Sequence, residues 1–425
     1  MEYNPHHDEY WRESALHNDI QRAFDICNGC RLCYNLCPSF PALFQIVEGY
    51  DNDAAKTRPE EMDRVADLCY QCKLCYVKCP YTPPHHYELD FPRLMLRSKA
   101  IRAKKRGMSR ADKFLGNPER VGQLGQVAPK LGNWSVNHSG LRAVMERLYG
   151  IDRRRHLPRF ALKRFSQWVK EHQARANSAS DDVDVVLFST CTVEYHEPGI
   201  GQAAIEVLRH NGIRAVVPDS QVCCGMPALD GGDIAGAIRR ARVNVALLAP
   251  YARANKTILA LQPTCALLLK QDYPTLVETE DARLVAEKTR DLTQYLSDAM
   301  KRGKLKKEFR SSPGSVTYHL SCHTKAQGLT RAAKQLLESI DGCEVEVVDR
   351  CAGIDGTWGL KKAYYDESIK VSAKVTERFR ERHDSRACSD CALAGLQIET
   401  VTDRAPVHPV EILARSYGLM EGNTP

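Results

Sequence analysis

The second half of the chain alternates between short apolar runs and longer amphipathic stretches, and it does so twice in the same order. In the first copy the pattern predicts three strands and two helices: 183–189, 213–217 and 257–261 for the strands, and 198–210 and 234–254 for the helices. In the second copy it predicts two strands and two helices: 316–320 and 345–348 for the strands, and 332–339 and 362–381 for the helices. Strand–helix alternation implies parallel sheets covered by helices on both faces. The pattern therefore predicts a repeated α/β unit.

The first half of the chain has a mostly helical pattern. An apolar face predicts a helix over 10–26, and further helices are expected at 40–47, 59–68, 141–149 and 160–172. The stretch 116–140 is expected to be less regular, and the small polar residues at 176–181 are typical of a domain boundary. We therefore expect an α+β multidomain protein. Its parts would be a helical unit, a basic and mostly helical bridge and two α/β domains, at 1–96, 97–180, 181–311 and 312–425.

One cysteine pattern occurs twice in the helical unit. Cys-x-x-Cys-x-x-Cys-x-x-x-Cys-Pro begins at Cys27 and again at Cys69. Three cysteines spaced by two residues can wrap one cubic iron–sulfur cluster, while the fourth, followed by proline, reaches the neighbouring cluster. Zinc sites rarely need three such spacings that end in Cys-Pro, and disulfides suit a secreted chain. The spacing therefore predicts two [4Fe–4S] clusters.

Because the fourth cysteine of each motif crosses over, each cluster is expected to draw ligands from both motifs. The two predicted ligand sets are Cys27, Cys30, Cys33 and Cys79 for the first cluster, and Cys69, Cys72, Cys75 and Cys37 for the second.

Cysteines also gather in the two α/β copies, mostly just after predicted strands. The carboxyl ends of parallel strands meet at one edge of a sheet, where reactive groups collect. We expect a metal or a further cluster in each copy, with these ligands: Cys191, Cys223, Cys224 and Cys265 in the first, and Cys322, Cys351, Cys388 and Cys391 in the second. Any one of these could be a buried, unligated cysteine, and Cys343 is expected to be one.

Aligning the two copies by their cysteines places Ala352 opposite Cys224 and Gln262 opposite Cys388. Each copy then holds four members of a five-cysteine pattern, and each lacks a different one. Glycines follow the central cysteine in both copies. Without a Cβ, the backbone there can approach a sulfur-rich centre and donate N–H groups to it.

Composition places this chemistry in a reducing compartment. The chain of 425 residues has 17 cysteines, its start lacks an apolar signal-peptide core, and its apolar runs are too short to span a bilayer. We therefore expect a cytoplasmic protein.

The net charge of +7 is unevenly distributed along the chain, because residues 97–175 carry 20 Lys and Arg against 5 Asp and Glu. Such a segment can dock a redox protein or anionic lipid, or be a solvated surface, and no recognition motif supports nucleic acid.

One competing motif lies in the first copy. Gly199-x-Gly201-x-x-Ala204, followed by Asp219, superficially matches a dinucleotide-binding fingerprint. In a true fingerprint the first glycine closely follows the strand, whereas here ten residues separate Ser189 from Gly199. The second copy lacks the glycines. The spacing therefore disfavours nicotinamide or flavin binding at this segment.

Cys223-Cys224-Gly225 after a strand, duplicated and preceded by a two-cluster ferredoxin module, resembles the cysteine-rich CCG family. Members include the B and D subunits of heterodisulfide reductase, the C subunit of anaerobic glycerol-3-phosphate dehydrogenase, and the iron–sulfur subunits of glycolate and lactate oxidases. The order of modules is similar to that of the heterodisulfide reductase D type and the glycerol-3-phosphate dehydrogenase C type. The resemblance covers nearly the whole chain, and the segments 223–227 and 353–359 are its most specific parts.

The resemblance implies an iron–sulfur electron-transfer subunit. Such a subunit relays electrons between a flavoprotein dehydrogenase, of the hydroxy-acid or glycerol-3-phosphate type, and a quinone or another carrier. It also implies that the chain can lie peripherally on the inner face of the cell membrane.

Two alternatives stay open. In the first, Cys223 and Cys224 belong to a catalytic cluster that reduces a disulfide, as in heterodisulfide reductases. Those enzymes need the five-cysteine set, which Gln262 and Ala352 interrupt here. In the second, zinc makes the α/β half a scaffold for a partner. A missing ligand could come from a histidine, and the candidates are His319, His323 and His196.

Overall fold

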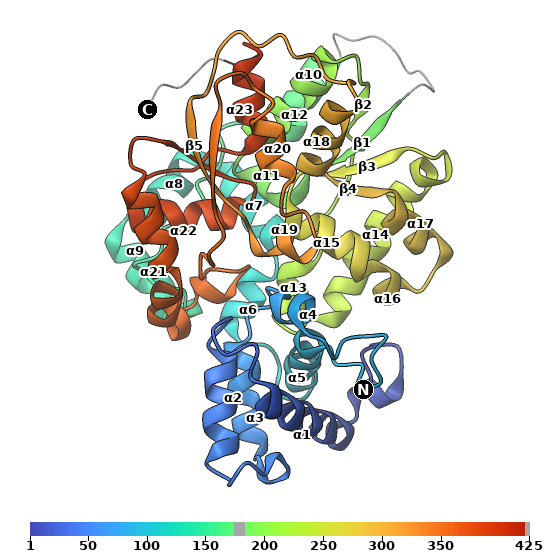
Figure 1. Cartoon of the computed structure of the whole chain (residues 1–425), viewed down its shortest axis with the longest axis vertical. Coiled ribbons are helices and arrows are strands. Elements are labelled where there is room, and N and C mark those ends of the chain that lie inside the picture. The colour runs from blue at the N-terminus through green and yellow to red at the C-terminus, as the bar shows by residue number, and fades with distance from the viewer. Residues whose placement is uncertain (174–182, 421–425) are drawn as a thin grey trace.

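The computed structural model describes residues 1–173 and 183–420. The helices of the N-terminal unit form the lower part of the molecule in Figure 1, and the two α/β repeats form the upper part. The boundary expected at 176–181 lies outside the described residues. No helix in the described ranges combines the length and apolar character needed to cross a membrane.

The N-terminal unit is helical, as its pattern predicts. Its α-helices are α1 (Glu13–Cys30), α2 (Ser39–Glu48), α3 (Pro59–Leu68), α4 (Leu74–Lys78) and α5 (Phe91–Arg106), with 3₁₀ turns η1 (Asp8–Trp11) and η2 (Ala54–Lys56). Pro59 begins α3, and the Arg58 backbone N–H donates to Glu61 Oε2 at 3.0 Å, which caps this end. Helix α5 runs without a break across 96/97, so the structural unit extends to Arg106.

The bridge contains two helices where an irregular stretch was expected. Its helices are α6 (Arg110–Leu115), α7 (Pro118–Val127), α8 (Pro129–Asn137), α9 (Ser139–Tyr149) and α10 (Phe165–Gln173). Glycines weaken the helical signal of α7. They are nevertheless required for packing, because a Cβ on Gly122 would lie 2.4 Å from Tyr195 Cγ, and one on Gly125 would lie 2.3 Å from Phe160 Cε1.

The first repeat is a parallel sheet in the order β2-β1-β3-β4. Its strands are β1 (Val185–Phe188), β2 (Ala215–Val216), β3 (Thr257–Ala260) and β4 (Thr289–Asp291). Its helices are α11 (Thr190–Tyr195), α12 (Pro198–His210), α13 (Met226–Asp230), α14 (Ile234–Arg253), α15 (Pro263–Gln271), α16 (Tyr273–Val277), α17 (Glu280–Lys288) and α18 (Leu292–Lys301). Strand β4 was not predicted, because its sequence Thr-Arg-Asp has no apolar run.

The second repeat is a parallel sheet in the order β6-β5-β7. Its strands are β5 (Ser315–His319), β6 (Glu344–Val348) and β7 (Arg386–Ser389). Its helices are α19 (Cys322–Ala326), α20 (Ala332–Leu337), α21 (Tyr365–Glu381), α22 (Ala392–Thr402) and α23 (Pro409–Ser416), with 3₁₀ turns η3 (Trp358–Leu360) and η4 (Lys362–Tyr364). The prediction of two repeated parallel-sheet units is confirmed, although β7 was not expected.

The two sheets share one hydrophobic core. Leu187 and Leu259 of the first sheet lie in the same buried cluster as Val316 and Tyr318 of the second, together with Leu413 of α23. Helix α23 packs against α12 of the first repeat, and α18 packs against α20 of the second. The repeats therefore stabilise each other through burial of a common apolar surface.

The strand register corrects the alignment of the two repeats. Ala260 is the last residue of β3 paired with β1, and Ser389 is the last residue of β7 paired with β5. Two residues further along lie Gln262 and Cys391, which are the N-caps of α15 and α22. Gln262 is therefore the structural equivalent of Cys391, and not of Cys388 as the cysteine spacing suggested.

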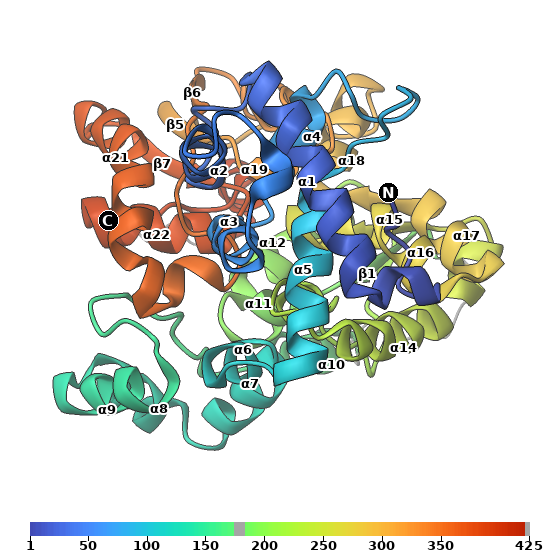
Figure 2. The ribbon, with the colours of Figure 1, turned by 90° about the horizontal axis from the view of Figure 1, so that it is seen from below.

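The N-terminal unit docks on the first repeat through a buried carboxylate. Asp272 Oδ2 lies 2.6 Å from Lys73 Nζ, and its Oδ1 lies 3.2 Å from Arg93 Nη2. Burial alone would raise the pKa of Asp272, but the charges of Lys73 and Arg93 outweigh it and lower the pKa. Figure 2 shows α5, which carries Arg93, lying across the middle of the molecule with the repeats on both sides.

Replacing this carboxylate should weaken the docking. We expect Asp272→Asn to lower the free energy of unfolding by about 3 kcal/mol, because two largely buried cations lose their shared partner. The matched control is Asp281→Asn, which breaks the exposed Arg253–Asp281 pair and should cost less than about 1 kcal/mol. Denaturation of the two variants in parallel measures the difference. Equal losses would show that Asp272 contributes no more than a surface ion pair.

Candidate metal centres

The first predicted ligand set gathers at the end of α1. Cys27 and Cys30 lie in its last turn, Cys33 follows in the loop, and Cys79 caps the end of α4. The four thiols line one small cavity walled by apolar side chains. Burial raises the pKa of Cys27, and the thiols of Cys33, Cys79 and Cys30 raise it further. The structure therefore brings Cys79 of the second motif to the first three cysteines of the first motif.

The second predicted ligand set is more deeply buried. Cys69, Cys72 and Cys75 are all buried. Burial raises the pKa of Cys75, and the thiols of Cys72, Cys69 and Cys37 add to the shift. Cys37 of the first motif therefore lies with the second set, just as Cys79 of the second motif lies with the first set.

Both cysteine loops turn at the same position. Arg31 and Lys73 each lie four residues after the first cysteine of their motif, and both adopt the left-handed conformation, with φ of 55° and 58°. Arg31 follows the last residue of α1, and its backbone N–H donates to Cys27 O, which ends the helix. Four sulfurs that converge from two turns, half-buried in the first set and mostly buried in the second, are a donor set suited to a metal centre, whose binding would deprotonate them. The residues present fit the predicted clusters.

The first repeat brings together its four predicted cysteines. The Cys265 and Cys224 sulfurs lie 3.3 Å apart, and hydrogen bonds from the thiols of Cys191 and Cys224 lower the pKa of Cys223. The Gly225 backbone N–H points at Cys223 Sγ, 3.5 Å away. Gly225 has φ of 104°, which a residue with a Cβ rarely adopts. Cys191 and Cys223 also line an open cavity of about 440 Å³.

Buried polar side chains hold the Cys223–Cys224 backbone in place. Asn244 Nδ2 donates to Cys223 O at 3.2 Å, and Tyr273 Oη donates to Cys224 O at 2.9 Å. Asn244 and Tyr273 are fully buried and are hydrogen-bonded to each other. This network fixes the two carbonyls so that both thiols face the site.

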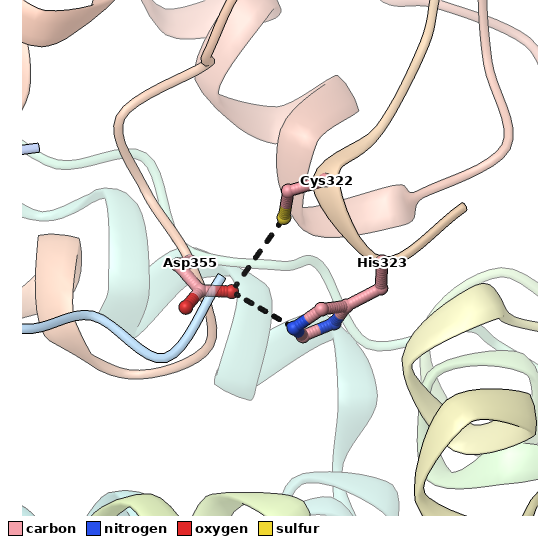
Figure 3. A group of neighbouring side chains, drawn as sticks. All are labelled: Cys322, His323 and Asp355. Atoms are coloured by element: carbon pink, nitrogen blue, oxygen red, sulfur yellow. Dashed lines mark hydrogen bonds and ion pairs between the residues drawn. The ribbon is translucent and has the colours of Figure 1, made fainter. Parts of the chain in front are cut away.

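The second repeat brings together only three of its predicted cysteines. Cys322, Cys351 and Cys391 line one small pocket. The Gly353 backbone N–H donates to Cys351 Sγ at 3.3 Å. Figure 3 shows Asp355 at the same place, with its Oδ1 4.0 Å from Cys322 Sγ. The donors of this pocket are therefore three thiols, the Asp355 carboxylate and the His323 ring, and the ligand atoms of Cys322, Asp355 and His323 all lie within 4.8 Å of one another.

The structure does not bring Cys388 to this pocket. Cys388 lies inside strand β7, is fully buried, and belongs to the shared hydrophobic core that also contains Cys343. Cys391 lies beyond the end of this strand, at the N-cap of α22, whereas the Cys388 side chain packs in the core. Cys388 and Cys343 are thus both core residues.

The candidate histidines differ in their surroundings. His319 also lines the second pocket, but its Nε2 lies 3.0 Å from Arg350 O and its Nδ1 lies 3.4 Å from Ser389 Oγ. His196 Nδ1 lies 3.0 Å from Arg159 O. His323 lies in the second pocket, with Nε2 3.8 Å from Asp355 Oδ1 (Figure 3).

Both ring nitrogens of His323 are hydrogen-bonded. Nδ1 lies 2.7 Å from Thr264 Oγ1, and Nε2 lies 3.2 Å from Gln71 O. Burial lowers the pKa of His323 to about 4, so the ring is neutral at physiological pH. His323 therefore joins the second pocket to the loop between Cys69 and Cys72.

The second ligand set and the pocket of the second repeat are neighbours. Tyr70 Oη lies 3.5 Å from Cys351 Sγ, and the Tyr70 ring lies 5.0 Å from the ring of Trp358. Tyr70, Cys72 and Trp358 form one buried cluster, against which Cys37 and Cys351 pack. Sequence reasoning assigned no role to Tyr70, Trp358 or Asp355. The last two lie in the specific segment 353–359, which was the only signal that could have indicated them.

The glycines of the competing fingerprint have a packing role. Gly199 and Gly201 lie inside α12, and a Cβ on Gly201 would lie 2.5 Å from Phe165 Cε2. Gly201 therefore allows α12 to pack against α10, and neither glycine forms a phosphate-binding turn.

Comparisons with known proteins agree with this geometry. Residues 20–106 match the "Citrate utilization protein B Fer4-like domain", and residues 185–270 and 316–399 each match the "Cysteine-rich domain", CCG. A Fer4-like domain followed by two cysteine-rich domains places the chain among the iron–sulfur proteins related to oxidoreductases. The chain belongs to the CCG cysteine-rich domain family, as its sequence predicts.

Two groups of relatives are similar to the chain. The C subunit of anaerobic glycerol-3-phosphate dehydrogenase from Escherichia coli (strain K12) is 27% identical over 304 residues, which cover 71% of this chain and 76% of the relative. Lactate utilization protein A of Bacillus thuringiensis (strain Al Hakam) and of Bacillus cereus (strain AH187) are each 31% identical over 218 residues, covering 49% of this chain and 87% of each relative. These relatives are consistent with an electron-transfer subunit of an oxidoreductase.

Proposed function

We propose that the chain is the iron–sulfur electron-transfer subunit of a multi-subunit oxidoreductase. It relays electrons between a flavoprotein dehydrogenase, of the hydroxy-acid or glycerol-3-phosphate type, and a quinone or another carrier. The observation that carries this proposal is the contact between the second ligand set and the second repeat, where Tyr70 Oη lies 3.5 Å from Cys351 Sγ. The relatives support it, because one is a dehydrogenase subunit and the other a lactate utilization protein.

Two [4Fe–4S] clusters fit the N-terminal unit in this proposal. The ligands would be Cys27, Cys30, Cys33 and Cys79 for one, and Cys69, Cys72, Cys75 and Cys37 for the other. When bound, such clusters supply reversible one-electron transfer. The surrounding apolar side chains, including Phe40 and Phe44 at the first set, exclude water and so help to set the reduction potential.

The two repeats would hold zinc or a further cluster. The ligands would be Cys191, Cys223, Cys224 and Cys265 in the first repeat, and Cys322, Cys351 and Cys391 with Asp355 in the second. Three thiols with one carboxylate make a tetrahedral zinc set chemically reasonable in the second repeat.

A second candidate function is catalytic. Cys191 and Cys223 border an open cavity of about 440 Å³, which is large enough to admit a small polar substrate. A centre held by Cys223 and Cys224 could there reduce a disulfide. Cys223→Ala and Cys224→Ala would then abolish disulfide reduction without changing the N-terminal iron content, whereas the core variant Cys343→Ala would keep both.

The proposed setting is cytoplasmic. The exposed cations of the basic segment 97–175 would face a redox partner or the inner surface of the membrane, whereas Arg97, Arg142 and Arg155 are buried, and no nucleic acid is involved.

The experiment that separates a relay from a self-sufficient dehydrogenase uses the purified chain alone. We expect the dithionite-reduced chain to reduce ferricyanide rapidly, yet to oxidise neither lactate, glycolate nor glycerol-3-phosphate when ferricyanide is the acceptor. Unaided oxidation of any of the three would contradict the proposal.

A further inference from the structure

A cavity of about 890 Å³ lies where the N-terminal unit, the bridge and both repeats meet. Its walls come from the carboxyl-terminal half of α5, from α6, from the end of α9, from the end of α13, and from η3 and η4. Neither the predicted metal centres nor the proposed catalytic cavity uses this space. Its volume is within the range of sites for small ligands, which often lie between domains.

Basic side chains dominate the lining of this cavity. They are Lys99, Arg102, Arg106, Arg110, Lys361 and Lys362, against three acidic residues, Asp67, Asp112 and Asp230. Most of these cations have acidic partners, such as Asp67 for Arg102 and Asp112 for Lys361. Arg106 and Arg110 are exposed and form no ion pair with any described residue. They are therefore free to bind an anionic group.

One wall of the cavity is aromatic. The rings of Trp358 and Tyr364 are stacked, with centroids 5.0 Å apart and an angle of 10° between their planes. Leu148 and Tyr149 line the same cavity and are 47% and 38% exposed, which is unusual for large apolar side chains that lie together. A planar ring would cover this apolar surface.

Asp230 is one of the acidic residues that line the cavity. Its Oδ1 is buried and has no hydrogen-bond partner among the described residues. Because this atom is not accessible from the cavity, a bound ligand would not reach it.

The aromatic wall leads directly to the proposed electron path. Trp358 belongs to the buried cluster that contains Tyr70 and Cys72, and Trp358 Nε1 donates to Asp67 O at 3.0 Å, which fixes the indole. A ring bound in the cavity would thus be separated from the second ligand set by Trp358 and Tyr70.

We propose that this cavity binds a planar ring that carries a phosphate, an electron carrier of the flavin mononucleotide type. The ring lies by Trp358 and Tyr364, and the phosphate binds Arg106 and Arg110. The binding itself does not depend on the proposed function, whereas its role as an electron carrier rests on it. The two-electron reduced ring would lose two electrons, one at a time, to the proposed iron–sulfur centres, and two protons to water.

Calorimetric titration of the anaerobically purified full chain tests the binding. The probes are flavin mononucleotide, riboflavin, which has the ring without the phosphate, and inorganic phosphate, which has no ring. We expect flavin mononucleotide to bind about tenfold or more tightly than either fragment, because only it uses both walls of the cavity. Equal affinity for riboflavin, or no binding of flavin mononucleotide at about 1 mM, would overturn the inference.

Variants locate the site. The double variant Arg106→Ala, Arg110→Ala should weaken flavin mononucleotide binding about tenfold and leave riboflavin binding unchanged. Arg120→Ala removes an exposed arginine outside the cavity and should change neither. Loss of binding in the control, or none in the double variant, would contradict the site. A chain that binds the nucleotide but passes no electrons would instead contradict the proposed function and the electron-carrier role that rests on it, and would leave the binding site in place.

Discussion

Replacing Cys79 with alanine should remove the centre whose other ligands lie in the first cysteine motif. The structure places Cys79 with Cys27, Cys30 and Cys33, although it belongs to the second motif. Iron should therefore fall from about eight to about four atoms per chain. The loss should equal that caused by Cys27→Ala, because each variant leaves three of the four thiols of the same set.

Double variants make this prediction specific. Cys79→Ala combined with Cys27→Ala should lose no more iron than either alone, whereas Cys79→Ala combined with Cys69→Ala should lose both centres, about eight atoms. Cys343→Ala is the matched control, because Cys343 lies in the hydrophobic core. Iron and acid-labile sulfide per chain measure the outcome. The reverse pattern would mean that each motif holds its own cluster.

A second large effect should distinguish the two cysteines of the Cys388-x-x-Cys391 pair. Cys391→Ala should release the metal of the second repeat, because Cys391 lines the pocket with Cys322 and Cys351. Cys388→Ala should leave that metal in place and only weaken the core, at a cost of about 1 kcal/mol. Zinc and iron analysis of the two variants, with thermal unfolding, measures both effects.

The opposite result would support the ligand set predicted from cysteine spacing alone, in which Cys388 binds the metal. If Cys388→Ala released the metal and Cys391→Ala retained it, the register of β7 in the second repeat would have to differ from that of the structure.

Cysteine spacing carried much information about this protein. The geometry of a cluster loop is local, so three cysteines at fixed separations predict a common site without knowledge of the fold. The crossing of Cys37 and Cys79 follows from the same rule, and the structure brings each to the opposite motif. Apolar periodicity likewise predicted five of the seven strands of the repeats in the described ranges, but only four of their thirteen α-helices: α12, α14, α20 and α21.

Other features depend on tertiary contacts that spacing does not encode. The equivalence of Gln262 and Cys391 follows from strand pairing, which the chain length between cysteines does not determine. Helix α7 contains glycines because Tyr195 and Phe160 need the room, and these rings come from distant segments. The contact of Tyr70 with Cys351 joins residues 281 positions apart. Such features can be recognised only from the folded structure, in which the units pack together.

The most direct test of the central claim is the iron, sulfide and zinc content of the anaerobically purified chain, combined with electron paramagnetic resonance during stepwise reduction. An electron-transfer subunit with two cubes in its N-terminal unit should contain about eight irons and show two one-electron reductions with magnetically interacting signals, because the two centres are adjacent. Zinc or further iron would then belong to the repeats. A chain with fewer than about four irons, or with clusters that no reductant changes, would contradict the claim.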